Sequence, residues 1–307
     1  MAQKINSKFS VLICTYNRPE MLKMALEALI EGTDEKPDQV VVVIGGDTRS
    51  DPIVEAYKDH PDIEVKLVKT KNVNLATSRN IGLLHCTGDI IAMTDDDAEV
   101  FPDWVTRMKE AHAAHPEAGA VGGAVIGSTS KSSFLSRLAD LATFPSPSET
   151  KYVRTLPGVN ISYKRKVLDE IGPQDVTLFR GEDVDFNWRV KKIGFEIFYD
   201  PQIKVIHHHR PTLLKFWHQN YMYGRAYYLV RKKWPEMYCI YPHHLKNAKD
   251  FLKLGNFFAA IFYEPVVYSL RMPGLFDKIK AMPILWINQL VWKFGMIQQM
   301  IIDRKTT

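Results

Sequence analysis

The chain of 307 residues is long enough for one large or two modest domains, and 46% of its residues are hydrophobic, which suffices for a real core. This composition excludes an intrinsically disordered chain. The net charge of +5 is too small to indicate a nucleic-acid-binding protein, and no zinc-finger spacing or basic N-terminal arm is present, so no nucleic-acid partner is expected. A small positive excess suits acidic ligands or an anionic membrane surface.

The cysteines and the N-terminus bear on where the chain works. Cys14, Cys86 and Cys239 are widely spaced and odd in number, so they support neither a disulfide framework nor a cysteine zinc site. A reducing compartment is therefore expected. The polar residues 1–8 run directly into a predicted strand and leave no room for the apolar segment of a signal peptide. We expect the chain in the cytoplasm.

The first half of the chain alternates strand and helix patterns. Strands are predicted at 9–14, 40–44, 63–68, 90–93 and 120–126, and helices at 19–30, 75–85 and 102–115. Such alternation predicts an α/β fold with a parallel sheet and helices on both of its faces. Many nucleotide-binding proteins use this architecture, although a fold alone does not establish a function.

The middle of the chain is less regular. Residues 128–155 are rich in Ser, Thr and Pro, which indicates an excursion over the surface or a lid. Regular patterns then return, with a strand at 158–163, helices at 164–171 and 181–192, and strands at 195–199 and 204–209.

From residue 213 onward the sequence is helical, aromatic and basic. We therefore expect a catalytic domain over residues 1–210 and a separate helical region over residues 211–307. Its mostly apolar stretches are interrupted by Glu264-Pro265 and by several polar residues, whereas a membrane span needs about 20 apolar residues. Two interpretations stay open: amphipathic helices at a membrane interface, or a helical bundle that packs on the main domain or forms a homo-oligomer.

Three consecutive carboxylates, Asp95, Asp96 and Asp97, follow the predicted strand at 90–93. A solvated turn would explain them, because carboxylates usually stay in water. In open α/β sheets, however, ligands bind just beyond the carboxyl ends of the strands. An oxygen-ligand site for Mg²⁺ or Mn²⁺ would lie at the same place.

Four segments, taken in their order and spacing, resemble the family 2 glycosyltransferases of the GT-A fold. The segments are Ser10–Arg18, Ser78–Gly82, Gly88–Asp97 and Glu182–Asp183, and the resemblance covers roughly residues 9–210. It implies a Rossmann-like, mostly parallel sheet. It also implies an inverting, metal-dependent transfer of a sugar from a nucleotide-diphosphate sugar, with a UDP-sugar expected, to a glycan or lipid-linked acceptor, as in polysaccharide biosynthesis.

The resemblance implies roles for the residues at the nucleotide end of the site. Thr15, Tyr16, Asn17 and Arg18 would lie against the nucleotide, and Arg79 would help to hold it, although a single arginine is usually a surface residue. Asp95 would contact the ribose or the metal, and Asp97 would ligate Mg²⁺ or Mn²⁺ bridging the diphosphate. Asp96 could share that ligation. A divalent cation suits this chemistry because it neutralises the leaving diphosphate.

One position departs from the family pattern. Members of this family usually carry an Asp-Asp pair after the second strand, which reads the base, whereas this chain has Gly45-Gly46-Asp47. Asp47 is the nearest candidate for that contact and is displaced toward the loop. The choice among UDP, GDP and dTDP is therefore left open.

Asp183 is the candidate general base of the reaction. Inverting transfer needs one carboxylate to accept the proton of the attacking acceptor hydroxyl. A position at a helix N-terminus favours the ionised form that a base requires. Glu182 would position the acceptor or Asp183, and N-terminal capping of the helix is the structural alternative for both residues.

Two further elements match the family on the acceptor and metal sides. Gly158 and Asn160 match a small-residue-then-Asn element that lines the acceptor side, with a bulge glycine at a strand end as the alternative. His207, His208 and His209 end a predicted strand. His207 is the preferred contact to the metal or the diphosphate, although strand-end histidines often only pack.

Two other functions fit part of these patterns. A sugar-1-phosphate nucleotidyltransferase also binds a nucleotide and a metal, but it normally has a glycine-rich phosphate loop, and Thr15–Arg18 contains no glycine. A non-catalytic nucleotide-sugar-binding protein would have little reason to keep complete acidic motifs. A processive polysaccharide synthase is disfavoured because the chain has no Gln-x-x-Arg-Trp element.

Overall fold

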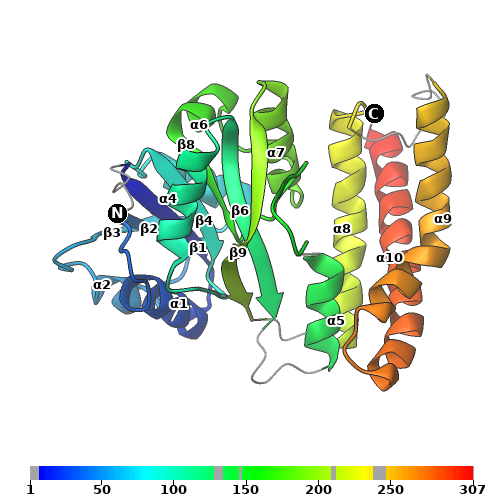
Figure 1. Cartoon of the computed structure of the whole chain (residues 1–307), viewed down its shortest axis with the longest axis horizontal. Helices are drawn as coiled ribbons and strands as arrows, with labels where there is room; N and C mark the ends of the chain where they lie inside the picture. Colours follow the sequence, from blue (N-terminus) through cyan, green and yellow to red (C-terminus); the bar gives the residue numbers. More distant parts are fainter. Residues whose placement is uncertain (1–6, 128–133, 145–146, 209–211, 238–246, 307) are drawn as a thin grey trace. The chain divides into compact units, whose positions relative to one another are not determined.

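The computed structural model describes residues 7–127, 134–144, 147–208, 212–237 and 247–306. These residues belong to two compact units, one within 1–128 and 144–208 and the other within 129–143 and 209–307. The first unit is built around a sheet and the second is helical (Figure 1). The expected boundary at residue 210, as well as His209 and Cys239, lies outside the described residues.

The described strands of the first unit join one nine-stranded sheet in the order β3-β2-β1-β4-β8-β6-β9-β5, with β7 beside β9. The strands are β1 (Phe9–Thr15), β2 (Gln39–Gly45), β3 (Glu64–Thr70), β4 (Ile90–Asp95), β5 (Ala98–Val100), β6 (Ala118–Gly127), β7 (Lys151–Tyr152), β8 (Ile161–Lys164) and β9 (Glu196–His207). Parallel strands β1 to β4 form one half of the sheet.

The other half of the sheet is mixed, which differs from a fully parallel arrangement. β8 runs antiparallel to β4 and β6, and both β5 and β7 run antiparallel to β9, while β6 and β9 are parallel. The two strands expected at 195–199 and 204–209 are one strand, β9, whose register with β6 shifts next to Gly123. Strand direction depends on where each connection returns, and a local hydrophobic pattern does not contain that information.

Helices cover both faces of this sheet, as expected. They are α1 (Pro19–Leu26), which continues into the π-helical turn η1 (Glu27–Glu31), α2 (Asp51–Glu55), α3 (Leu75–Leu83), α4 (Trp104–Ala114), α6 (Arg165–Ile171) and α7 (Glu182–Lys192). Side chains alternate along each strand. Phe9, Val11 and Ile13 of β1 therefore join one core cluster with α1 and α4, while Leu12 joins a second cluster with α6 and α7.

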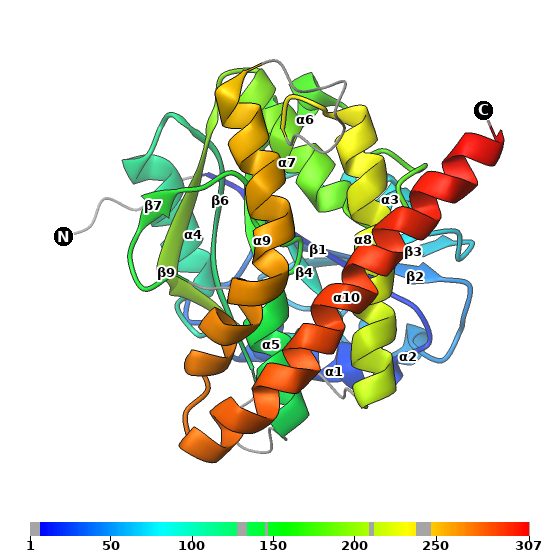
Figure 2. The same ribbon diagram turned by 90° about the vertical axis from the view of Figure 1, so that its right-hand side faces the viewer.

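The helical unit contains α5 (Phe134–Thr143), α8 (Leu213–Lys233), α9 (Ala248–Leu270) and α10 (Leu275–Thr306). Helix α10 runs beside α8 and α9 (Figure 2). Two glycines allow α8 and α10 to approach closely. A Cβ atom on Gly224 would lie 1.8 Å from the carbonyl oxygen of Trp292, and a Cβ atom on Gly295 would lie 2.1 Å from the carbonyl oxygen of Tyr221. No described helix combines the length and the apolar character needed to cross a bilayer.

Helix α5 corrects the expectation of an irregular excursion at 128–155. Its residues Leu138 and Ala139 are buried, and Leu138 packs with Met272, Ala281 and Leu285 of the helical unit. Arg137 of α5 also lies 2.8 Å from Asp277. The Ser-, Thr- and Pro-rich residues on either side conceal this short amphipathic helix in the sequence.

A buried histidine in α4 predicts an acid-sensitive fold. His112 Nε2 lies 2.9 Å from Ser162 Oγ, and burial, with the Lys164 charge nearby, lowers the pKa of His112 to about 3. The pKa of a histidine in an unfolded chain is about 6.5. Below that pH the unfolded chain therefore binds a proton that the folded chain excludes. The free energy of unfolding should fall by about 2 kcal/mol between pH 7 and pH 5.

Urea unfolding of the wild type and of His112→Gln at both pH values measures this contribution. Gln retains an N–H donor for Ser162 but does not titrate. The difference in the free energy of unfolding between pH 7 and pH 5 should therefore be about 2 kcal/mol smaller in the variant than in the wild type. His85→Gln, in the same unit, serves as the control and should show the same pH dependence of stability as the wild type. An unchanged pH dependence in His112→Gln would show that other groups cause the acid sensitivity.

Candidate active site

The acidic triplet lies at the carboxyl edge of the parallel strands. Asp95 is the last residue of β4, and Asp96 and Asp97 form the turn into β5. Because β1 is paired directly with β4 and ends at Thr15, the loop 15–18 reaches the same edge. This is the edge at which open α/β sheets bind their ligands.

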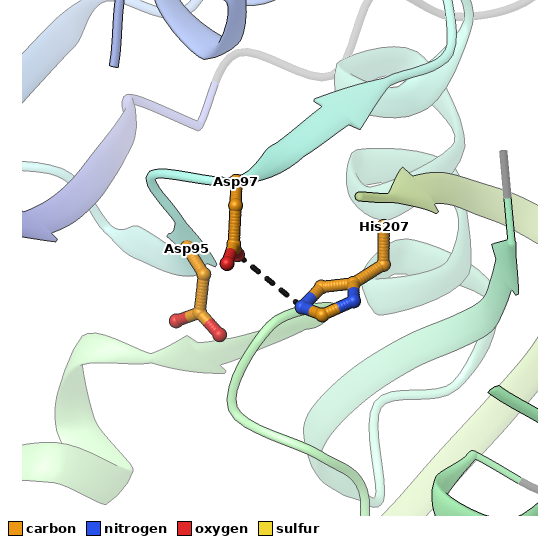
Figure 3. Close-up of side chains that lie close together, drawn as sticks. All are labelled: Asp95, Asp97 and His207. Atoms are coloured by element: carbon orange, nitrogen blue, oxygen red, sulfur yellow. Dashed lines mark ion pairs between the residues drawn. The ribbon is translucent and has the colours of Figure 1, made fainter. Parts of the chain in front are cut away.

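Asp95, Asp97 and His207 point toward one another (Figure 3). One potential ligand atom from each residue lies within 4.8 Å of the other two, and Asp97 Oδ1 is 3.2 Å from His207 Nε2. His207 ends β9 and pairs with Ala98 of β5, which brings it next to the acidic turn. Two carboxylates and an imidazole form a donor set that fits Mn²⁺ and can also accommodate Mg²⁺ together with substrate oxygens.

Asp96 does not belong to this cluster and contacts the loop after β1. It accepts hydrogen bonds from Thr15 Oγ1 at 2.7 Å and from Arg18 Nη1 at 3.1 Å, and it is buried. Burial raises the pKa of Asp96 to about 6, against the lowering effect of Thr15 and Arg18. Asp95 and Asp97 thus approach His207, whereas Asp96 faces the loop after β1 and shares Arg18 with Asp97.

Arg18 and Asp47 support the loop after β1. Arg18 Nη1 also lies 2.8 Å from Asp97, and its side chain is 54% exposed. Asn17 adopts a left-handed backbone conformation with φ of 60°, and its N–H donates to Asp47 Oδ2 at 2.8 Å. Tyr16 is exposed. The predicted nucleotide loop and Asp47 therefore meet in the folded chain.

Arg79 is a buried cation between two acidic segments. Its Nη2 lies 3.2 Å from Asp95 Oδ1 and its Nη1 lies 3.0 Å from Glu182 Oε1, although Glu182 is 103 positions away in the chain. The turn at Gly158 approaches the guanidinium so closely that a Cβ on this residue would lie 2.7 Å from both terminal nitrogens. A larger residue there would therefore displace the Arg79 guanidinium.

Glu182 and Asp183 begin α7 after Gly181, which has a left-handed φ of 77°. Glu182 is buried beside Arg79; burial, followed by the Asp183 charge, raises the pKa of Glu182 against the opposing effect of Arg79. Asp183 is partly exposed, and its Oδ2 accepts the Gly158 N–H at 3.2 Å. Glu182 thus faces the buried arginine, while Asp183 remains accessible.

Asn160 is placed in the interior of the sheet unit. Its Oδ1 accepts the Trp104 indole N–H at 2.9 Å, and its Nδ2 donates to the carbonyls of Ala124 at 3.0 Å and Ile203 at 2.9 Å. These contacts join α4, β6 and β9, so a structural role accounts for the amide. Its expected place on the acceptor side stays a prediction.

Sequence reasoning missed two aromatic residues that support the site. The Phe144 ring packs against the His207 imidazole at 5.3 Å between centroids, and Trp104 anchors Asn160. Neither residue belongs to a recognisable motif. Phe144 in particular comes from the segment that was expected to be an irregular excursion, and only its tertiary contact reveals it.

Comparisons with known proteins agree with this fold. The family model described as Glycosyl transferase family 2 matches residues 10–172. A glucosyl-dolichyl phosphate glucuronosyltransferase of Haloferax volcanii is 30% identical over 223 residues, which cover 65% of this chain and 69% of that protein. A pre-mycofactocin glycosyltransferase of Mycobacterium tuberculosis is 30% identical over 192 residues, which cover 58% of this chain and 39% of that protein.

Solved structures show the same fold. The mannosyltransferase PcManGT from Pyrobaculum calidifontis, in complex with GDP-Man and Mn2+, matches with a TM-score of 0.66 at 17% identity over 96% of this chain and 87% of that chain. TarS from S. aureus matches with a TM-score of 0.59 at 17% identity over 98% and 92% of the two chains. The fold and the site together define a glycosyltransferase of the GT-A class. Within that class, the chain belongs to glycosyltransferase family 2.

Proposed function

We propose that this glycosyltransferase is inverting and metal-dependent, and that it moves a sugar from a nucleotide-diphosphate sugar, with UDP as the expected nucleotide, to a glycan or lipid-linked acceptor. The observation that carries the proposal is the arrangement around Arg79. This one buried side chain contacts both Asp95, beside the candidate metal ligands, and Glu182, next to the candidate base Asp183. A metal end and a base end of one site are thereby connected.

At the donor end, Asp95, Asp97 and His207 would hold Mg²⁺ or Mn²⁺. When bound, the cation would neutralise negative charge on the leaving diphosphate. The residues 15–18 would cover the nucleotide, with the half-exposed Arg18 guanidinium available to phosphate oxygens. Asp96 would serve this end indirectly, because its hydrogen bonds to Thr15 and Arg18 position the loop.

At the acceptor end, Asp183 would act as the general base. Its carboxylate takes the proton from the acceptor hydroxyl while that oxygen forms a bond to the anomeric carbon. The bond between this carbon and the diphosphate oxygen breaks on the opposite face, which inverts the configuration. The Gly158 N–H orients Asp183 Oδ2, and Glu182, which is paired with Arg79, would act as a positioning residue.

A lipid-linked acceptor is supported by the Haloferax relative, whose name gives a dolichyl phosphate-linked sugar as the molecule it modifies. With such an acceptor, the enzyme would work at the cytoplasmic face of a membrane. The C-terminal helices would then contact either the lipid surface or a second copy of the chain.

A thermal-shift panel of UDP-, GDP- and dTDP-sugars with Mn²⁺, Mg²⁺ or a chelator tests this function. A donor at 100 times its Kd should stabilise the protein by about 2.7 kcal/mol, and chelation should remove that gain. Transfer or hydrolysis of the stabilising donor is then measured. Absence of any metal-dependent shift across the panel would contradict the proposal, and formation of a nucleotide-sugar from a nucleoside triphosphate and a sugar-1-phosphate would indicate the nucleotidyltransferase instead.

A further inference from the structure

Helix α10 exposes an apolar stripe along most of its length. Eight apolar residues, between 37% and 75% exposed, follow one another at intervals of three or four positions: Leu275, Ile279, Met282, Trp286, Leu290, Phe294, Ile297 and Ile301. This spacing places them on one side of a helix. Its neighbour α9 adds exposed side chains that include Phe258, Phe262 and Leu270. A patch of this extent marks an interaction surface.

The tip of the α9–α10 hairpin, residues 270–282, is anchored on its other side. Met272 and Ala281 are buried and pack in one cluster with Leu138 of α5. Leu275, Phe276 and Ile279, on the outward side, are 75%, 74% and 62% exposed. The exposed apolar residues are therefore held in place by a packed core, and their exposure is not the consequence of a frayed end.

Positive charge accompanies this apolar surface. Residues 209–307 contain fifteen Lys and Arg against five Asp and Glu, whereas residues 1–208 contain 25 against 30. At the hairpin tip, Lys280 Nζ lies 5.0 Å from the Phe276 ring centroid, and the Arg271 guanidinium lies 5.4 Å from that of Tyr268. Asp277, the acid of the tip, is paired with Arg137. A cation beside an exposed apolar ring, as Lys280 is beside Phe276, is typical of side chains at a lipid interface.

We propose that the hairpin tip and the apolar stripe of α10 dock in the plane of an anionic lipid bilayer. Leu275, Phe276 and Ile279 would enter the boundary between headgroups and acyl chains, and Lys278 and Lys280 would contact anionic headgroups. A symmetric contact with a second copy would cover the same apolar residues. It would also place two units of net positive charge next to each other, so the charge favours an anionic surface.

Flotation with lipid vesicles tests this docking surface on the full chain. The wild type should bind vesicles of phosphatidylcholine mixed with phosphatidylglycerol and should bind pure phosphatidylcholine much more weakly. Lys278→Gln combined with Lys280→Gln should weaken binding to the mixed vesicles by about 25-fold, since each basic residue near the surface contributes about a fivefold factor. Added salt should reduce binding in the same direction.

Phe276→Glu combined with Ile279→Glu should abolish binding to both kinds of vesicle. Leu84→Glu, which changes an 84% exposed leucine in the other unit, is the matched control and should bind as the wild type does. Far-ultraviolet circular dichroism confirms that each variant is folded. Wild-type binding that is absent, or equal for neutral and anionic vesicles, overturns the proposal.

Donor binding and oligomeric state are measured as well, so that lipid binding can be distinguished from loss of donor binding and from dimerisation. Donor-induced thermal shifts are recorded for every variant, so a failure of the glycosyltransferase proposal is seen independently of lipid binding. Light scattering gives the oligomeric state. The wild type could prove to be a dimer that does not bind vesicles. If Phe276→Glu combined with Ile279→Glu then dissociates that dimer, a second copy occupies this surface and the lipid proposal is overturned.

Discussion

Asp183→Asn should lower the rate of sugar transfer by about 10²- to 10⁴-fold while donor binding is retained, because a positioned general base contributes a factor of this size. The amide has nearly the shape of the carboxylate and can still accept one of the two backbone N–H groups, of Gly158 and Val184, that the carboxylate accepts, so the fold should change little. It cannot take the proton of the acceptor hydroxyl. Initial rates of transfer and the thermal shift caused by donor and metal are the two measurements.

Asp169→Asn is the matched control, since it removes an exposed carboxylate from the same unit. This variant should transfer sugar at the wild-type rate. Transfer at the native rate by Asp183→Asn would remove Asp183 from the role of base. Loss of the donor-induced shift in that variant would place Asp183 on the donor side.

Arg79→Met should lower the free energy of unfolding by about 3–5 kcal/mol, because it leaves two carboxylates without their buried cation. Arg79 is only 4% exposed and lies within 3.2 Å of both Asp95 and Glu182. Because methionine fills much of the same space, the loss of stability should come mainly from the missing charge and much less from missing side-chain volume. Urea unfolding at neutral pH measures it.

Arg18→Gln provides the comparison for this prediction. It also removes an arginine paired with two carboxylates, Asp96 and Asp97, but the side chain is 54% exposed. Pairs accessible to water contribute about 0–1 kcal/mol, so the loss of stability should be small. Equal losses of stability in the two variants would show that burial does not increase the contribution of Arg79 to the free energy of unfolding.

Local patterns were sufficient for much of the fold. The apolar runs that form β1, β2 and β4 predicted buried strands within one or two residues of their ends, and the acidic start of α7 marked a helix at the correct position. The family assignment is confirmed by the family model, which matches residues 10–172. Each of these features depends on residues close together in the chain.

Several features that depend on distant residues were not predicted. The antiparallel direction of β8 depends on its pairing with β4, and the helix α5 becomes recognisable through the packing of Leu138 against Met272. Similarly, the interior contacts of Asn160 involve three separate elements. No short window of sequence contains these partners.

The sequence by itself determined the class of fold, the family and the presence of an acidic triplet, because these follow from local hydrophobic patterns and short motifs. Only the tertiary structure decided how the triplet is divided. It brings Asp95 and Asp97 to His207, and it joins Asp96 to Thr15 and, together with Asp97, to Arg18. Three identical adjacent side chains differ only in the partners that the folded chain places around them, and those partners come from elements up to 112 positions away.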